Sequence, residues 1–205
     1  MAGERRGSAF AALLLTSLAI APAAAQPQPQ PQPQPATVAA CVACHGGPGQ
    51  PPLAGLPSIA AQPKVFIENQ LVLIREGLRD IPAMTALMRG VSDAEIVALA
   101  QHFAALPPPP PGAVHQAAKA GQGAELARKL LCGTCHLPTY AGQMQVPRLA
   151  AQQEDYLLHS MKQFRDKPGP GRDTIMAATL RGLSDAELGQ LAHYLATEAA
   201  PAKAP

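Results

Sequence analysis

The chain has 205 residues, of which 47% are hydrophobic and 15% are charged, and its formal net charge is +2. Nothing in this nearly neutral chain resembles the basic footprint of nucleic-acid binding, so we expect no nucleic-acid partner. The chain is also poor in aromatic residues, with no tryptophan, three tyrosines and four phenylalanines.

The first 25 residues have the pattern of an export signal. Arg5 and Arg6 give a positive start, an apolar run follows over 9–20, and small alanines occupy 23–25. The sequence therefore predicts a cleaved signal peptide over residues 1–25, with an uncleaved membrane anchor as the alternative. No later stretch reaches the roughly 18 apolar residues of a membrane span, so we expect the mature protein to be soluble or peripheral at a membrane.

Proline divides the rest of the chain. Residues 26–35 alternate Gln and Pro, and Pro107–Pro111 is an unbroken proline run. Both stretches favour an extended polyproline conformation and exclude helix. The predicted segments are a Gln/Pro-rich spacer over 26–35, one domain over 36–106, a linker over 107–112, a second domain over 113–200 and a flexible tail over 201–205.

One short pattern, Cys-x-x-Cys-His, occurs once in each predicted domain and accounts for all four cysteines. It is formed by Cys41, Cys44 and His45, and again by Cys132, Cys135 and His136. Two thiols at this spacing can each form a thioether with a haem vinyl group, and the adjacent histidine is then held under the iron. The sequence therefore predicts two covalently bound haem c groups. A zinc site or a pair of disulfides is the alternative for paired cysteines, but neither explains the histidines.

The two domains are an internal repeat when they are aligned from these motifs. Leu56–Gln62 corresponds to Val146–Gln152, and an apolar stripe with helical spacing follows in each half. Ser92 and Ser184, each with a glutamate three residues later, are typical of capping boxes that begin a final helix. No alternating strand pattern stands out, so we expect an all-α protein. Because a segment of about 70 residues is near the lower limit for a self-sufficient core, a buried haem in each half would supply missing apolar mass, and we expect the haem-free chain to be largely unfolded.

One methionine occupies an equivalent position in each half. Met84 lies 39 residues after His45, and Met176 lies 40 residues after His136. Core filling is the commoner role of a methionine, but the matched placement favours a sixth ligand to each iron. A thioether ligand raises the reduction potential and closes the iron to other ligands, which suits an electron carrier.

These features together resemble a diheme cytochrome c of the c4 type, built from two class I cytochrome c domains, over about residues 38–198. The resemblance rests on both Cys-x-x-Cys-His motifs, both methionines, the Ser-Asp-Ala-Glu helix starts, and the stretches Pro57–Gln62 and Pro147–Gln152. It implies two tandem class I domains, each wrapped around one covalent haem with His/Met ligation. It also implies that a backbone carbonyl near Pro57 and near Pro147 holds each imidazole by its second nitrogen.

The chain departs from the family pattern in two respects. Only residues 36–40 separate the Gln/Pro repeat from Cys41, too few for the helix that Gly121–Leu131 supplies in the second half, so we expect a more exposed first haem. In addition, Ala61 and Ala151 stand where the family has glycine.

The resemblance implies a periplasmic electron carrier rather than an enzyme. We expect single electrons to pass from a bc1-type complex or a periplasmic dehydrogenase to an acceptor such as a terminal oxidase. One alternative is a cytochrome subunit of a periplasmic flavin or quinoprotein dehydrogenase. A diheme peroxidase needs an iron with an open position, which two matched methionines disfavour. No catalytic residue is expected, because no carboxylate or histidine outside the haem motifs forms a matched acid–base pair.

Overall fold

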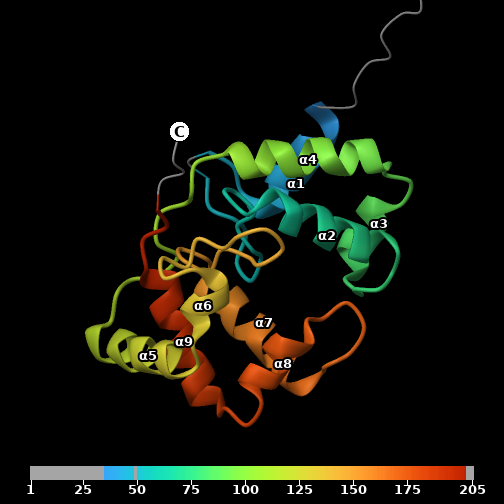
Figure 1. Ribbon diagram of the computed structural model, residues 1–205. Coiled ribbons are helices and arrows are strands. Elements are labelled where there is room, and N and C mark those ends of the chain that lie inside the picture. The colour runs from blue at the N-terminus through green and yellow to red at the C-terminus, as the bar shows by residue number, and fades with distance from the viewer. Residues whose placement is uncertain (1–34, 49, 202–205) are drawn as a thin grey trace, which may run out of the picture. The chain divides into compact units, whose positions relative to one another are not determined.

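The computed structural model describes residues 35–48 and 50–201. The predicted signal peptide over 1–25, nearly all of the spacer over 26–35, and residues 202–205 lie outside these ranges. Within the described ranges the chain forms nine α-helices and no β-strand, which confirms the all-α class (Figure 1). The helices are α1 (Pro35–His45), α2 (Lys64–Arg75), α3 (Pro82–Met88), α4 (Asp93–Ala105), α5 (Ala117–Lys129), α6 (Cys132–His136), α7 (Glu154–Asp166), α8 (Thr174–Leu180) and α9 (Asp185–Thr197).

Helices α1 to α4 form the first half, in which α2 packs against α4 and α3. Its apolar side chains form two separate clusters. In one, Ile67 of α2 packs with Phe103 of α4, and Val42 of α1 lies on the edge of the cluster. In the other, Ile74 of α2 packs with Met88 at the end of α3. The apolar face of α4 is buried in these clusters, with Ile96 in the second and Leu99, Ala100 and Phe103 in the first.

Residues 36–40 are helical, so the expectation that too few residues precede Cys41 for a helix is wrong. Helix α1 continues through the first Cys-x-x-Cys-His motif and reaches 11 residues in this way. In the second half the two elements are separate, because α5 ends at Lys129 and α6 begins after Leu131. Leu131 lies in the left-handed region at φ 56° and breaks the helix.

Helix α9 is the centre of the second half and packs against both α5 and α7. Leu188, Leu191 and Leu195 of α9 are at most 3% exposed, and they join Leu157 of α7 and Leu180 of α8 in one cluster. The second half therefore has a single continuous core, whereas the first half has two smaller clusters.

Both predicted capping boxes are confirmed. The backbone N–H of Glu187 donates to Ser184 Oγ at 3.3 Å, and the Ser184 N–H donates to the Glu187 carboxylate at 2.8 Å. Ser92 and Glu95 repeat both contacts at the same distances. The boxes determine where α4 and α9 begin, and each capping serine lies eight residues after the methionine predicted as an iron ligand in its half.

Candidate functional site

The histidine of each Cys-x-x-Cys-His motif ends a helix and donates a hydrogen bond to a proline carbonyl. His45 Nδ1 lies 2.9 Å from Pro57 O, and His136 Nδ1 lies 2.8 Å from Pro147 O. A carbonyl can only accept, so Nδ1 carries the proton and Nε2 keeps its lone pair for a metal. Burial lowers the pKa of both histidines, although the proline carbonyls oppose this, and a lowered pKa favours the neutral form that ligates iron. Both carbonyl contacts implied by the resemblance are therefore present.

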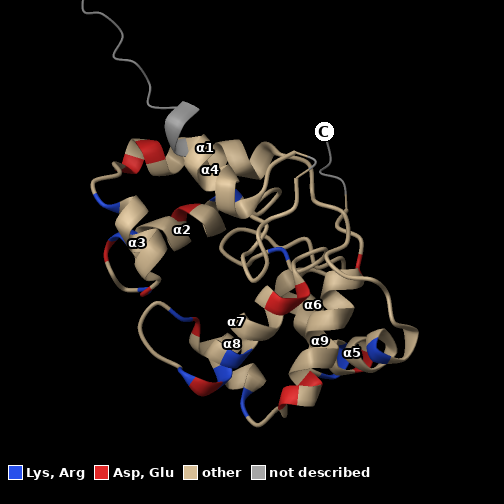
Figure 2. Cartoon of the chain, turned by 180° about the vertical axis from the view of Figure 1, so that it is seen from behind, with Lys and Arg blue, Asp and Glu red and all other residues tan. Residues whose placement is uncertain are grey.

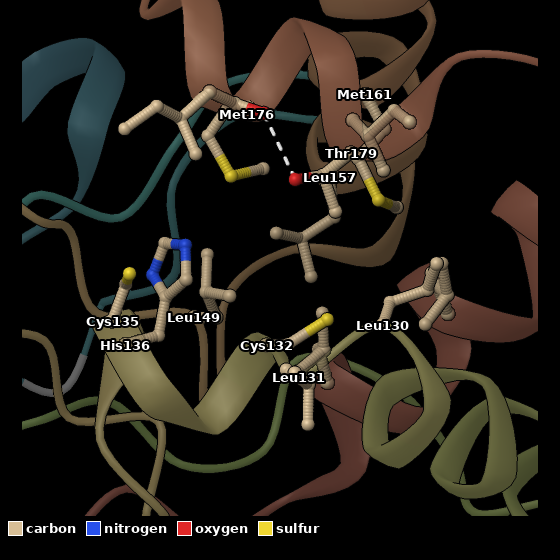
Figure 3. Close-up of a pocket in the computed structure, with 14 residues that line it drawn as sticks. Leu130, Leu131, Cys132, Cys135, His136, Leu149, Leu157, Met161, Met176 and Thr179 are labelled. Atoms are coloured by element: carbon tan, nitrogen blue, oxygen red, sulfur yellow. Dashed lines mark hydrogen bonds between the residues drawn. The ribbon is translucent and has the colours of Figure 1, made fainter.

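In the second half, the four predicted site residues line one pocket (Figure 3). Cys132, Cys135 and His136 come from α6, and Met176 comes from α8. In Figure 3 the His136 ring and the Met176 thioether point toward one another across the pocket. The remaining walls are almost entirely apolar and are formed by Leu130, Leu131, Leu149, Leu157, Met161, Ile175, Thr179, Leu180, Leu191 and Leu195.

This set of donors fits a covalently attached haem. Two thiols, one imidazole and one thioether face a space of about 610 Å³, which includes its opening to solvent. The thiols match the vinyl groups, the nitrogen and sulfur match the two axial positions, and the leucine walls match the apolar macrocycle. Burial also raises the pKa of Cys132, so an unmodified thiol at this position is held in its protonated form.

In the first half, the corresponding residues lie on the equivalent helices. Cys41, Cys44 and His45 are on α1, and Met84 is on α3, where it packs half-buried against the Ile74 cluster. His45 is half-buried, whereas His136 is only 4% exposed. A more exposed first haem remains a prediction, and this difference is in its favour.

None of the four cysteines is joined to another in a disulfide. The part of the chain that the structure describes also contains no group of three or more His, Cys, Asp and Glu side chains that could hold a metal ion. The disulfide and zinc alternatives thus have no supporting geometry among the described residues.

Comparisons with known proteins agree with this geometry. Residues 120–198 match the family model for cytochrome c, and residues 30–103 match the model for subunit III of cbb3-type cytochrome c oxidase. Cytochrome c4 of Thiocapsa roseopersicina is 31% identical over 167 residues, covering 76% of this chain and 85% of that protein. The chain belongs to the cytochrome c4 family. It therefore carries two covalently bound haem c groups in two tandem class I cytochrome c domains, and it takes part in electron transfer.

Two further similarities extend the comparison. The crystal structure of reduced cytochrome c4 from Pseudomonas stutzeri superimposes with a TM-score of 0.72 at 27% identity, covering 79% of this chain and 95% of that one. A thiosulfate dehydrogenase electron acceptor of Stutzerimonas stutzeri strain A1501 is 32% identical over 170 residues, covering 77% of this chain and 78% of that protein.

The polar contacts that join the two halves of the chain could not be predicted from the sequence. The side-chain amide of Gln62 contacts both backbone polar groups of Arg148, and Gln152 does the same at Ser58. These four residues are at most 4% exposed. The one signal in the sequence is that a glutamine follows two alanines at equivalent positions in both halves, and this signal does not identify the residue that each glutamine contacts.

Arg148 is the most deeply buried cation of the described chain. Its guanidinium donates to the carbonyls of Ser58 and Ala60 in the first half and to the carbonyl of Ala150 beside it. Its Nε is buried and has no hydrogen-bond partner within the described residues. Burial lowers the pKa of Arg148 to about 10, which still leaves it charged at neutral pH.

Proposed function

We propose that this cytochrome shuttles single electrons in the periplasm, with one haem in each of the domains predicted over 36–106 and 113–200. Haem 1 is attached to Cys41 and Cys44 and ligated by His45 and Met84; haem 2 is attached to Cys132 and Cys135 and ligated by His136 and Met176. The convergence of two thiols, an imidazole and a thioether on one apolar pocket of the second half carries this proposal. The internal repeat extends it to the first half.

The haem supplies the one-electron chemistry, and the chain controls it through the surroundings of the iron. The proline carbonyls orient the histidines and hold the proton on Nδ1. The methionines offer a neutral thioether, which favours the reduced state and occupies the position that an enzyme would keep open. The leucine-rich walls exclude water and thereby also favour the state with less charge. These effects together suit a high-potential electron carrier.

The periplasmic location rests on two observations. Residues 1–25 have the pattern of a cleaved export signal, and thioether attachment of haem in bacteria takes place outside the cytoplasm. None of the helices that the structure describes is long and apolar enough to cross a membrane. Western blotting of separated periplasmic and membrane fractions tests this assignment, and a membrane-bound product would favour the uncleaved anchor.

We expect a bc1-type complex or a periplasmic dehydrogenase to be the donor and a terminal oxidase to be the acceptor. Figure 2 shows basic and acidic residues interspersed along both halves, and the formal net charge is only +2. Long-range steering is therefore weak, and docking depends on short-range contacts near the haem edges. Electron-transfer rates should accordingly change little with ionic strength; a steep loss of rate in salt would contradict this docking mode.

A second candidate is the electron acceptor of a dedicated dehydrogenase. It is favoured by the 32% identity to a protein named as a thiosulfate dehydrogenase electron acceptor. Copurification of the mature chain with a stoichiometric dehydrogenase would support this subunit role, whereas a chain that purifies alone and reduces an oxidase would support the free carrier.

The ligand assignment is tested by optical redox titration of the mature protein and of Met84→Ala and Met176→Ala. We expect each variant to lose one high-potential component and to keep the other. Met144→Ala is the matched control, because Met144 is 69% exposed and has no counterpart in the first half. Unchanged titrations in both ligand variants would refute the assignment.

A further inference from the structure

We propose that each half of the chain tunes the axial histidine of the other half, with Gln152 acting on haem 1 and Gln62 acting on haem 2. The inference rests on the histidine ligands proposed above. It makes the two glutamines positioning residues, since each acts on a ligand through an intervening peptide group.

The peptide group that joins Pro57 to Ser58 is hydrogen-bonded at both of its ends. Its carbonyl accepts from His45 Nδ1 at 2.9 Å, and its N–H, which belongs to Ser58, donates to Gln152 Oε1 at 2.7 Å. Gln152 Nε2 then donates to Ser58 O at 2.9 Å. Ser58 is 3% exposed and Gln152 is 2% exposed, so water does not compete for these groups.

The second half repeats the arrangement with the roles of the halves exchanged. The carbonyl of Pro147 accepts from His136 Nδ1 at 2.8 Å, and the N–H of the same peptide group, on Arg148, donates to Gln62 Oε1 at 2.9 Å. Gln62 Nε2 completes the pair by donating to Arg148 O at 3.1 Å. The geometry is therefore reciprocal, and a chance surface contact would not be expected to recur in this way.

A hydrogen-bonded chain of this kind polarises its own members. When the amide N–H donates to a glutamine oxygen, electron density at the carbonyl of the same peptide group increases, and the carbonyl becomes a stronger acceptor. A stronger acceptor draws the Nδ1 proton and makes the imidazole a more electron-rich ligand. Electron-rich ligands favour ferric iron, so each glutamine lowers the potential of the haem in the opposite half.

The simpler alternative is that the glutamines only hold the two halves together, and the direction of the potential shift separates the two roles. Loss of a purely structural contact admits water to the interface, and solvent exposure favours the more charged ferric state and lowers the potential. Loss of the tuning contact weakens the proline carbonyl as an acceptor and raises the potential.

The experiment uses the full chain with both haems bound and compares Gln152→Met with Gln62→Met. We expect Gln152→Met to raise the potential of haem 1 and to move its hyperfine-shifted NMR signals, and Gln62→Met to do the same to haem 2. Gln153→Met is the control, because the hydrogen bond from Gln153 to Gln152 is donated by the backbone N–H, which the substitution keeps. A shift confined to the haem of the mutated half, a downward shift, or no shift would overturn the proposal.

Failure of this proposal is distinguishable from failure of the ligand assignment. If the glutamine variants keep their His/Met spectra but show no upward shift, only the tuning role is lost. If Met84→Ala and Met176→Ala leave the spectra unchanged, the ligands themselves are wrong.

Hydrogen exchange on the unmutated protein gives a second test that does not depend on the folding of a variant. Ferric iron makes the Nδ1–H of His45 a stronger donor, which strengthens the whole chain up to Gln152. We expect the Ser58 amide to exchange more slowly in the oxidised protein than in the reduced one, relative to the Ala61 amide, which donates to Phe103 O. If the ratio of the Ser58 exchange rate to the Ala61 exchange rate were the same in the oxidised and reduced proteins, the proposal would be contradicted.

Discussion

His193 donates a hydrogen bond from Nδ1 to Glu154 Oε2 at 2.8 Å, and this pair joins α9 to the start of α7. The backbone N–H of Gln116 donates to His193 Nε2 at 3.0 Å, so Nε2 must be unprotonated and the proton must reside on Nδ1. Lys119 Nζ lies 2.5 Å from the other oxygen of Glu154. His193 is fully buried, as expected for a packed helix residue, and the Glu154 carboxylate connects three segments of the second half.

We expect this cluster to make the stability of the protein decline in acid. Partial burial raises the pKa of Glu154, but hydrogen bonds from Lys119 and His193 outweigh this effect, so the pKa lies below its ordinary value of 4.5. A carboxylate whose pKa is lower in the folded chain than in the unfolded chain stabilises the fold at pH values above its ordinary pKa. This stability is lost as the pH falls through the pKa of the folded state.

Thermal unfolding of the haem-loaded protein and of Glu154→Gln, from neutral pH down to about pH 3, checks this prediction. The difference in Tm between the unmutated protein and Glu154→Gln should be largest at pH values above the ordinary pKa of glutamate and should shrink at lower pH. Glu125→Gln is the control, because it removes the same charge from an exposed position on α5. A Glu154→Gln difference that stays constant down to acid pH would contradict the linkage.

Close packing of α5 on α9 should make Gly123 irreplaceable. A Cβ atom at Gly123 would collide with the carbonyl oxygen of Gln190 and would lie 2.6 Å from Tyr194 Cβ. Gly123→Ala must therefore push the helices apart, at a cost of about 1–3 kcal/mol for overpacking. In Gly121→Ala, two positions earlier, the added Cβ meets nothing within 4 Å, and alanine should stabilise the helix by up to about 1 kcal/mol. Denaturant unfolding of the two variants should shift in opposite directions, and equal midpoints would count against the packing argument.

Local patterns account for the parts of the molecule that could be predicted from the sequence. The Cys-x-x-Cys-His motifs and the capping boxes each lie within five consecutive residues, so chemistry and spacing are sufficient to identify them. The bond between Gln152 and Ser58 joins residues 94 positions apart, and a polar side chain in a sequence does not name its partner. Residues 36–40 alone are too few for a stable helix, so the sequence did not predict one there. The helix forms because it continues through the Cys41 motif, and this continuation is not visible in the sequence.

The alanines at 61 and 151 show how a departure from the family pattern is accommodated. Ala61 has φ 54° and Ala151 has φ 56°, in the left-handed region that favours glycine. The amide of each donates to the end of the last helix of its half, to Phe103 O and to Leu195 O respectively. The sequence could reveal the replaced glycines but not these compensating hydrogen bonds, which depend on the packed helices.

Each capping serine should contribute measurably to stability. Ser184→Ala removes the acceptor for the Glu187 N–H and one half of the box, so we expect a loss of about 1 kcal/mol in the free energy of unfolding. Ser92→Ala should cost a similar amount through the start of α4. Ser160→Ala is the control, because Ser160 lies inside α7, where alanine is the better helix former. Equal stability of Ser160→Ala and Ser184→Ala would show that the boxes contribute nothing.

Removal of both haems should unfold most of the chain. The first half has two small apolar clusters in place of one core, and the second half leaves a leucine-lined pocket between α6 and α8. Without the macrocycle these walls face water, and domains of fewer than about 100 residues have little other burial to compensate. We expect a variant with all four cysteines changed to serine to lose its cooperative thermal transition and most of its helical circular dichroism.

A Cys41→Ser/Cys44→Ser variant, which keeps the attachment site for haem 2, should retain one transition, because the continuous core around Leu191 belongs to the second half. A cooperative transition in the variant without any attachment cysteine would show that the polypeptide alone supplies the stability.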